Sequence, residues 1–319
     1  MIEAILNVIR EGNHFVVASH AHPDGDAIAS TLALVNFLRE IGKQAVAFNV
    51  DGVPEELQFL PGAHQVVSDR SLLDRYDAGF ILDSGQLDRA GDFLPDHCLQ
   101  LINIDHHPHS QLFGSVNYLD DDACATGAMI HRVILASGHP VSPDVAVCIY
   151  TAILSDTGSF RYSNANPEAF AIASAMIEAG VSPWHVAGNL YESHPVEQVK
   201  LLSRVLDTLT VSSCGRFGSV TVTSEMFLAT GAGPEHTDGL INYPRSIRGV
   251  EVALFFRQVE SDLFKVSFRS KGHVDVGSLA RELGGGGHHN AAGATVSGSM
   301  EQVRQIVFDR LNELLPLSL

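Results

Sequence analysis

The sequence predicts an α/β fold: an N-terminal, mainly parallel sheet with helices on both faces, followed by a smaller C-terminal α/β domain. Two observations lead to this prediction. Short apolar runs alternate with segments of helical periodicity through the first half of the chain, which is the pattern of βαβ units. At 319 residues, the chain also exceeds the size at which a single hydrophobic core usually stops growing, so two domains are expected.

Apolar segments of the first domain are each followed by acidic or histidine side chains. The first of these segments leads into the motif HAHPDGD at 20–26, and a helical pattern with Gly42 at its end comes next. In chain order, the segments and the side chains after them are 14–19 with His20, Asp24 and Asp26; 78–82 with Asp83; 101–104 with Asp105, His106 and His107; and 145–154, a buried helix or strand, with Asp156.

Because the carboxyl ends of parallel strands meet at one edge of a sheet, these side chains are expected to converge. A single Asp after a strand is more often a helix cap or a turn former than a metal ligand. Several carboxylates gathered at one edge would repel one another unless a cation neutralised them. Carboxylate and imidazole together favour Mn²⁺, with Mg²⁺ or Co²⁺ as substitutes, and the lack of thiolates argues against structural zinc. The sequence therefore predicts a pair of divalent metal ions.

The domain organisation follows from composition and glycine content. We expect a first domain at 1–188, a linker at 189–210 and a second domain at 211–319, in which strands and a short helix precede GGGGHHNAAG at 284–293. Four consecutive glycines carry a large entropy cost. Such a run favours close approach of a ligand's phosphates to bare backbone N–H groups, and the alternative is a flexible loop.

The charge distribution limits the class of ligand. The net charge is −17, and residues 1–190 hold 8 Lys and Arg against 23 Asp and Glu, a net of −15. Residues 242–281 hold 7 basic and 4 acidic residues, a net of +3. Duplex DNA requires a basic footprint, so a duplex-DNA partner is excluded. A metal site beside a local basic patch suits a small anionic ligand instead.

The sequence also bears on location. No apolar run reaches the roughly 18 residues that cross a membrane, and residues 1–13 have the pattern of an amphipathic helix, unlike a signal peptide. The four cysteines are widely spaced without a CxxC pair. We therefore expect a cytoplasmic protein with reduced thiols and no membrane partner.

The motifs resemble those of the DHH phosphoesterase superfamily. The resemblance rests on HAHPDGD at 20–26, LDSGQLDRAG at 82–91, IDHH at 104–107 and SDTGSFRYSN at 155–164, while GGGGHHNAAG at 284–293 and FRSKG at 268–272 look like its DHH-associated C-terminal domain. It spans nearly the whole chain in the expected order. The length is most similar to the nanoRNase (NrnA) type, the bifunctional oligoribonucleases and 3′-phosphoadenosine 5′-phosphate (pAp) phosphatases.

The resemblance implies roles for individual residues. One metal ion would be held by His20, Asp24 and Asp83, and the second by Asp26, Asp83, His106 and Asp156, with Asp83 as the bridge. His107 would face the substrate as a catalytic group, and Asp105 would orient a histidine. Substrate phosphate or nucleotide would be bound by Arg269, Gly285, Gly286, Gly287 and His288. Arg248 and Arg161 are further candidates, for which a surface salt bridge is the alternative. No role is assigned to His22 or His289.

The predicted function is a phosphohydrolase with a two-metal mechanism. Its partners would be short single-stranded RNA, dinucleotides or pAp, and the resemblance makes a homodimer an additional expectation. A phosphodiesterase for linear dinucleotides such as pApA and pGpG is an alternative, as is a single-strand exonuclease. An inorganic pyrophosphatase shares the metal motifs but has another type of C-terminal domain. A non-catalytic nucleotide-binding regulator would be expected to lack a metal ligand, and none is missing.

Overall fold

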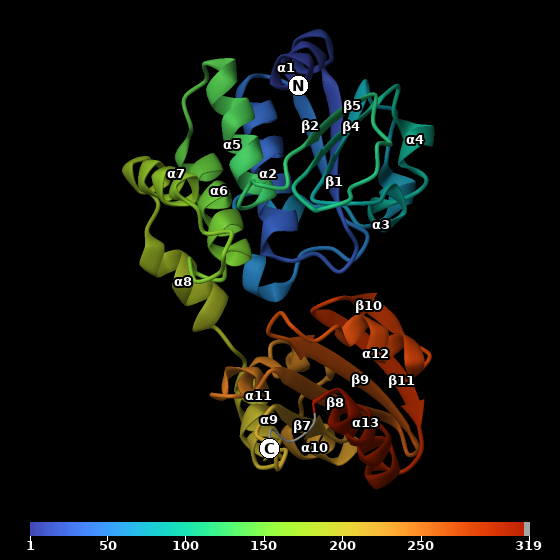
Figure 1. Cartoon of the computed structure of the whole chain (residues 1–319). Coiled ribbons are helices and arrows are strands. Elements are labelled where there is room, and N and C mark those ends of the chain that lie inside the picture. The colour runs from blue at the N-terminus through green and yellow to red at the C-terminus, as the bar shows by residue number, and fades with distance from the viewer. Residues whose placement is uncertain (316–319) are drawn as a thin grey trace. The chain divides into compact units, whose positions relative to one another are not determined.

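The chain folds into two compact units, each with a sheet and a hydrophobic core of its own (Figure 1). The structure is a computed structural model that describes residues 1–315. The first unit is Met1–Ser193, and the second begins at His194. Both units combine helices with a sheet, so the predicted α/β class is confirmed.

The sheet of the first unit has five strands, all parallel, in the order β2-β1-β3-β4-β5. The strand order reverses direction between β1 and β3. In open parallel sheets, ligands bind outside the carboxyl ends of the strands at such a reversal. The strands are β1 (His14–Ser19), β2 (Gln44–Phe48), β3 (Ala78–Leu82), β4 (Leu101–Asp105) and β5 (Val116–Leu119).

Helices cover both faces of this sheet, as predicted. Side chains alternate along β1: Phe15 and Val17 enter the core formed with α1, α2, α5 and α6, whereas Val16 and Ala18 face α3 and α4. Figure 1 shows α2, α5, α6 and α7 together beside the sheet and α3 and α4 opposite them. The helices are α1 (Ile2–Glu11), α2 (Gly25–Glu40), α3 (Leu87–Ala90), α4 (Leu94–His97), α5 (Thr126–Ser137), α6 (Pro143–Asp156), α7 (Pro167–Glu178) and α8 (Pro183–Tyr191).

The second unit is built on a six-stranded mixed sheet in the order β10-β11-β9-β8-β7-β6, in which only β7 and β8 pair in parallel. Two helices pack on one face and three on the other. The strands are β6 (Thr210–Val211), β7 (Phe217–Val222), β8 (Val252–Glu260), β9 (Leu263–Ser270), β10 (Gly286–His288) and β11 (Ala291–Ser297). The helices are α9 (Val196–Leu206), α10 (Ser224–Thr230), α11 (Asn242–Ser246), α12 (Val276–Glu282) and α13 (Met300–Leu314).

The segment 167–187 lies in two separate helices, α7 and α8, because Gly180 has a φ of 109° and Pro183 begins a new helix. The four cysteines form no disulfide. Among residues 1–315, every helix is too short or too polar to cross a lipid bilayer.

Candidate active site and metal centre

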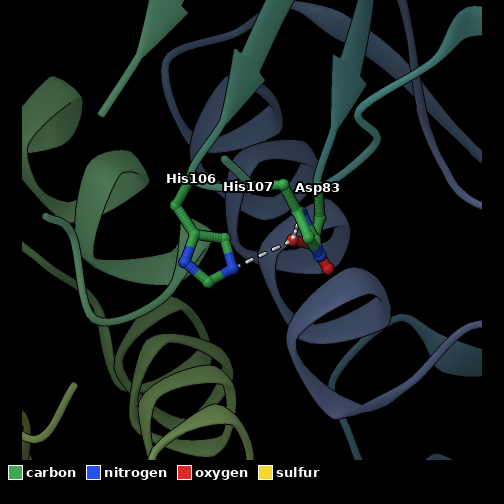
Figure 2. Close-up of side chains that lie close together, drawn as sticks. All are labelled: Asp83, His106 and His107. Carbon is green, nitrogen blue, oxygen red and sulfur yellow. Dashed lines mark ion pairs between the residues drawn. The ribbon is translucent and has the colours of Figure 1, made fainter. Parts of the chain in front are cut away.

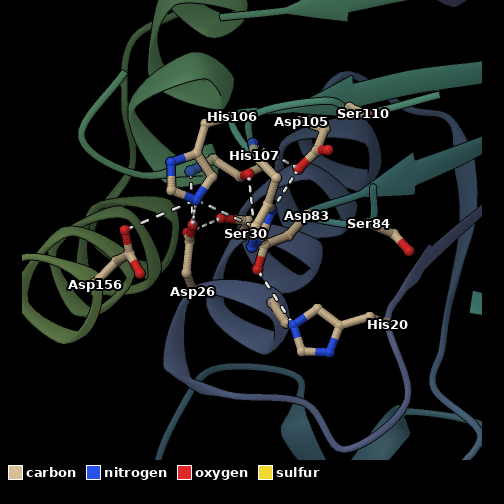
Figure 3. Close-up of polar contacts among 12 residues, drawn as sticks. His20, Asp26, Ser30, Asp83, Ser84, Asp105, His106, His107, Ser110 and Asp156 are labelled. Carbon is tan, nitrogen blue, oxygen red and sulfur yellow. Dashed lines mark hydrogen bonds and ion pairs between the residues drawn. The ribbon is translucent and has the colours of Figure 1, made fainter. Parts of the chain in front are cut away.

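The candidate site lies where β1, β3 and β4 end. His20 follows β1 directly, Asp83 follows β3, and His106 comes immediately after Asp105, the last residue of β4. The three strands are parallel neighbours in the sheet, and the strand order reverses between β1 and β3. Their side chains therefore converge at one edge of the sheet, as Figure 3 shows.

The start of α2 contributes two more carboxylates. Asp24 is the N-cap of α2 and accepts a hydrogen bond from the N–H of Ala27 at 3.0 Å, which is the usual way that Asp begins a helix. Asp26 lies in the first turn and is buried. Gly25 between them is required by packing, because a Cβ at this position would lie 2.3 Å from the Oγ of Ser155. The start of α2 thereby touches the end of α6.

Asp156 reaches the site from a helix. Of the two alternatives for 145–154, a buried helix and a strand, the structure has the helix: Asp156 is the last residue of α6, which begins at Pro143 with Ser142 as its N-cap. The apolar run 145–154 is buried on all sides, and a short buried helix has no periodicity that distinguishes it from a strand. The side chain nevertheless points into the same cluster (Figure 3).

The side chains form two groups of metal-ligand type that share one residue. In the first group, the Nε2 of His20 lies 3.5 Å from Asp83 Oδ2 and 4.0 Å from Asp24 Oδ1. In the second group, the Nε2 of His106 lies 3.4 Å from Asp83 Oδ1, and it is 3.7 Å from both Asp26 Oδ2 and Asp156 Oδ2. Within His20, Asp24 and Asp83, and within Asp26, His106 and Asp156, the donor atoms lie within 4.8 Å of one another.

Asp83 stands between the two groups, and each of its carboxylate oxygens faces a different one. Figure 2 shows the side chains of His106 and His107 directed toward this carboxylate. The backbone of Asp83 has a φ of 55°, in the left-handed region that residues other than glycine rarely adopt. Strained backbone of this kind concentrates at functional sites, where the surrounding structure holds it in place.

The two histidines are oriented by backbone carbonyls. The Nδ1 of His20 lies 2.9 Å from the carbonyl oxygen of Ala21, and the Nδ1 of His106 lies 3.2 Å from that of Ala123. A carbonyl oxygen can only accept, so each Nδ1 carries the donated proton, and Nε2 is the ring atom that can bind a metal ion once it is deprotonated. Both Nε2 atoms face the carboxylates, which is the arrangement seen around bound metal ions.

Asp26 is held by the N-terminus of α5, a contact that sequence reasoning missed. Its carboxylate accepts from the N–H of Thr126 at 2.6 Å, from the N–H of Gly127 at 3.0 Å and from the Oγ of Ser30 at 2.7 Å. The positive end of a helix dipole favours a carboxylate at this place. A Cβ on Gly127 would lie 2.4 Å from that of Ala152, so the small residues in the sequence Ala125-Thr126-Gly127 were the available signal.

The carboxylates and histidines of the cluster shift one another's pKa values. Burial, together with the charge of Asp83, raises the pKa of Asp26 well above its usual value. Burial also raises the pKa of Asp156, to about 6. Burial alone would lower the pKa of His106, but its hydrogen bond to Asp83 and the charge of Asp26 outweigh burial and raise that pKa to about 10. The electrostatics of the cluster therefore favour a positive charge between these carboxylates.

The donor set fits two divalent ions. The first would be held by His20, Asp24 and Asp83, and the second by Asp26, Asp83, His106 and Asp156. These donors are carboxylate oxygens and imidazole nitrogens, which suit Mn²⁺ and related ions. A shared ligand must offer an oxygen to each ion, and Asp83 has one oxygen on each side.

His107 and Asp105 form a separate pair beside the metal cluster. The Nδ1 of His107 lies 2.8 Å from Asp105 Oδ1, and this hydrogen bond is the main cause of the raised pKa of His107. Asp105 is fully buried, whereas the His107 side chain is 42% exposed. Asp105 thus orients His107, and part of the imidazole ring is exposed.

In the second unit, Arg269 and His288 lie in one row of the sheet. Both are register partners of Ala291, Arg269 from β9 and His288 from β10. Partners across neighbouring strands share a face, and two strand spacings of about 4.8 Å separate these residues. Arg269 is half-buried, and among residues 1–315 no carboxylate oxygen lies within 4.0 Å of its guanidinium group. A half-buried cation without a carboxylate favours an anionic ligand.

The glycine run forms a strand. Gly286 and Gly287 belong to β10, the edge strand of the sheet, and their register partners are Gly293 and Ala292. A Cβ on Gly285 would lie 2.1 Å from the carbonyl oxygen of Gly293, and Gly287 has a φ of 140°. Close packing of β10 on β11 therefore explains these two glycines. The outer edge of β10 still offers backbone groups without a strand partner.

Two arginines lie near the end of α11. Arg248 is exposed and, within the described residues, makes no ion pair. The charge of Arg245, which sequence reasoning missed, acts on Arg269: after burial, it lowers the pKa of Arg269. The pair of arginines in PRSIR at 244–248 was the available signal.

Comparisons with known proteins bear on this arrangement. Two family models match: "DHH family, N-terminal domain" over residues 14–153 and "DHHA1 domain" over residues 219–315. A relative from Thermus thermophilus, named bifunctional oligoribonuclease and PAP phosphatase NrnA, is 33% identical over 300 residues, which cover 94% of this chain and 89% of the relative. The chain belongs to the DHH family. The resemblance inferred from the motifs is confirmed, and the protein is a hydrolase that acts on phosphoester bonds.

Two more relatives of this DHH protein match over most of their length. A protein of the same name from Bacillus subtilis is 29% identical over 300 residues, which cover 92% of each chain. The solved structure of an exopolyphosphatase-related protein from Bacteroides fragilis has 28% sequence identity and a TM-score of 0.91, and the match covers 98% of this chain and 95% of that one. These matches therefore extend over both units of the chain.

Proposed function

We propose that this DHH-family hydrolase degrades very short RNA, down to dinucleotides, to nucleoside monophosphates and removes a phosphate from pAp, with two Mn²⁺ ions as cofactors. The observation that carries the proposal is the shared carboxylate of Asp83 between two groups of metal-ligand type. The relatives named bifunctional oligoribonuclease and PAP phosphatase support this choice of substrate.

The donor residues described above suit two divalent metal ions. Bound there, two divalent ions supply a nucleophile at neutral pH and charge neutralisation at the phosphoryl group. The role of the protein is to fix their positions. His20 and His106 present oriented Nε2 atoms, and Asp83 offers one oxygen to each side.

His107 is the group of this chain that acts on the reacting phosphate. Asp105 accepts a hydrogen bond from the Nδ1–H group and stabilises the charged ring, so Nε2 carries a proton that it can donate to a phosphoryl or leaving-group oxygen. Imidazole groups suit proton transfer near neutral pH. An Asp that orients the histidine and stabilises its cation is a common companion.

The second unit binds the part of the substrate remote from the reacting phosphate. Arg269 offers a guanidinium fork that matches phosphate geometry, and His288 lies in the same row of the sheet. Residues 242–281 carry a net charge of only +3, while residues 1–190 carry −15. A long polyanion would meet more repulsion than attraction, so short substrates are favoured.

A substrate panel tests the proposal. Metal-free protein is supplied with Mn²⁺, and turnover of pAp, pApA, a 5-mer and a 24-mer RNA is measured side by side, with Asp83→Ala as the inactive control. We expect turnover of pAp and of RNA up to the 5-mer, and little turnover of the 24-mer. Turnover of pApA alone would make the protein a dinucleotide phosphodiesterase. Equal rates on the 24-mer would identify a general single-strand exonuclease, and turnover in excess chelator would refute the two-metal mechanism.

A further inference from the structure

The turn between β1 and α2, which carries His20, is held by a side chain from another strand. Asn49 follows β2 directly and is fully buried. Its Nδ2 donates to the carbonyl oxygen of His20 at 3.0 Å and to the Oγ of Ser19 at 3.1 Å. Its Oδ1 accepts from the N–H of Asp51 at 3.1 Å. The amide of Asn49 therefore joins the end of β2 to the end of β1.

Asp51 continues this connection. Its Oδ2 accepts from the N–H of His22 at 2.6 Å. His22 has a φ of 55°, in the left-handed region, and its side chain is 95% exposed. The carboxylate of Asp51 thus holds a backbone conformation that a residue with a Cβ does not favour. The ring Nδ1 of His22 also lies 3.5 Å from Asp51 Oδ2, but the ring is largely exposed, so the shorter bond from the N–H group is the contact that holds the turn.

The ring of His20 depends on the same turn. The N–H of Ala21 donates to the carbonyl oxygen of Arg89 at 2.6 Å, and the carbonyl oxygen of Ala21 accepts from the ring of His20. Three consecutive residues, 20 to 22, are therefore each held by a group from elsewhere in the chain. If the turn moves, the acceptor for Nδ1 moves with it, and Nε2 no longer points at Asp24 and Asp83.

We propose that Asn49 and Asp51 together form a brace that positions His20 for the first metal ion. This brace affects the metal affinity of the first site and not that of the second. The inference rests on the proposed function, because it assumes metal binding by His20, Asp24 and Asp83. Neither residue touches the reacting atoms, so both are positioning residues. Outer partners of this type change metal affinity by roughly 10- to 100-fold when they are removed.

The second metal site is held by different contacts. Asp26 is bound by the N-terminus of α5 and His106 by the carbonyl oxygen of Ala123. Asn164 holds Asp156: its Nδ2 donates to Asp156 Oδ2 at 3.1 Å and to the carbonyl oxygen of Cys124 at 2.9 Å. Asn164 is therefore a matched control for Asn49, since both are asparagines that hold a ligand of one site only.

The test is a titration of metal-free, full-length protein with Mn²⁺, in which the electron paramagnetic resonance signal reports free Mn²⁺. Wild type is expected to bind two ions. In Asp51→Ala and Asn49→Ala, affinity at one site should fall roughly 10- to 100-fold. Asn164→Ala should weaken one site as well, and the double variant Asp51→Ala/Asn164→Ala should weaken both. His22→Gly, which keeps the N–H and suits the left-handed backbone, should bind both ions as wild type does.

Asn49 is buried and also contributes to folding, so Asn49→Ala can fail to fold. The Asp51 side chain is 41% exposed, so Asp51→Ala then serves as the test of the brace. A merely structural role would lower the melting temperature without changing one Mn²⁺ affinity selectively, and excess Mn²⁺ would not restore turnover. Two intact sites in Asp51→Ala would overturn the brace while leaving the proposed function standing. A wild type that binds no Mn²⁺ would overturn both.

Discussion

The two units use charged side chains in opposite ways. In the first unit, Asp26, Asp83 and Asp105 are buried, and their carboxylates accept hydrogen bonds from helices, histidines or hydroxyl groups of other elements. In the second unit, Arg269 is half-buried without a carboxylate partner among the described residues, and His288 is exposed. The first arrangement is fixed before any ligand arrives. The second presents positive charge that an anionic ligand would neutralise.

This difference separates two kinds of contribution to the rate. Groups held rigidly around the reacting phosphate stabilise the transition state and act on kcat. Groups that bind a remote part of the substrate stabilise substrate and transition state alike, so their loss raises KM. Substitutions in the first unit should therefore change kcat and those in the second KM, and a variant that behaves otherwise would break the comparison.

The largest effect is expected for Asp83→Asn. The amide keeps the shape of the side chain but offers only one oxygen, so one of the two groups loses its shared ligand. Loss of a contact worth several kcal/mol to the transition state lowers kcat by about 1,000-fold or more. Steady-state kinetics on pAp with Mn²⁺ measures this loss, and circular dichroism checks the fold. A variant with kcat within tenfold of wild type would contradict the bridging role.

Mn²⁺ is expected to stabilise one unit selectively. Each ion that binds only the folded state at 100 times its Kd adds about 2.7 kcal/mol, and one such ion alone raises the melting temperature of a unit of this size by roughly 5–10 °C. Hydrogen exchange followed by mass spectrometry should show slower exchange in β1 and α2 with Mn²⁺ present. Peptides from β9 and β11 serve as the internal control, and equal protection in both units would contradict a metal centre confined to the first.

The sequence was sufficient for the parallel sheet and for the side chains at its carboxyl edge. His20, Asp83 and His106 follow apolar strands, and strand ends in a parallel sheet meet by geometry. The convergence of these residues could therefore be predicted from the local pattern of an apolar strand and the polar residue after it. Asp156 lies in the same cluster as expected, but the sequence left open whether a helix or a strand carries it, because a fully buried helix and a buried strand share one composition.

The contacts that fix the cluster could not be predicted in this way. Thr126 and Gly127 bind Asp26 across 100 positions of sequence, and Asn49 binds the turn after β1 from a neighbouring strand. These contacts depend on how α5 and β2 pack, which no local period encodes. The glycines at 285–287 show the reverse case, since a feature interpreted as a ligand contact also has a packing reason in the hairpin of β10 and β11.

A smaller effect, on KM, is expected for Arg269→Ala. Hydrogen bonds to charged groups contribute about 1.5–3 kcal/mol, so KM for pAp should rise roughly 10- to 100-fold while kcat stays within a few-fold of wild type. Arg269→Lys keeps the charge but loses the planar guanidinium fork, so its KM should lie between those of wild type and Arg269→Ala. A large loss of kcat at unchanged KM would place Arg269 with the reacting groups and end the division between the units.

The smallest effect is expected for Arg248→Ala, which tests how far the anion-binding surface extends. Arg248 is exposed and lies outside the row of Arg269 and His288. Exposed charge pairs contribute about 0.2–1 kcal/mol, so KM should rise by less than about fivefold and the rise should vanish at high salt. Arg245→Ala is the matched comparison, because the charge of Arg245 acts on Arg269 and should matter more. If Arg248→Ala raises KM as much as Arg269→Ala does, the surface that binds substrate is wider than one row of the sheet, and the preference for short RNA would need another cause.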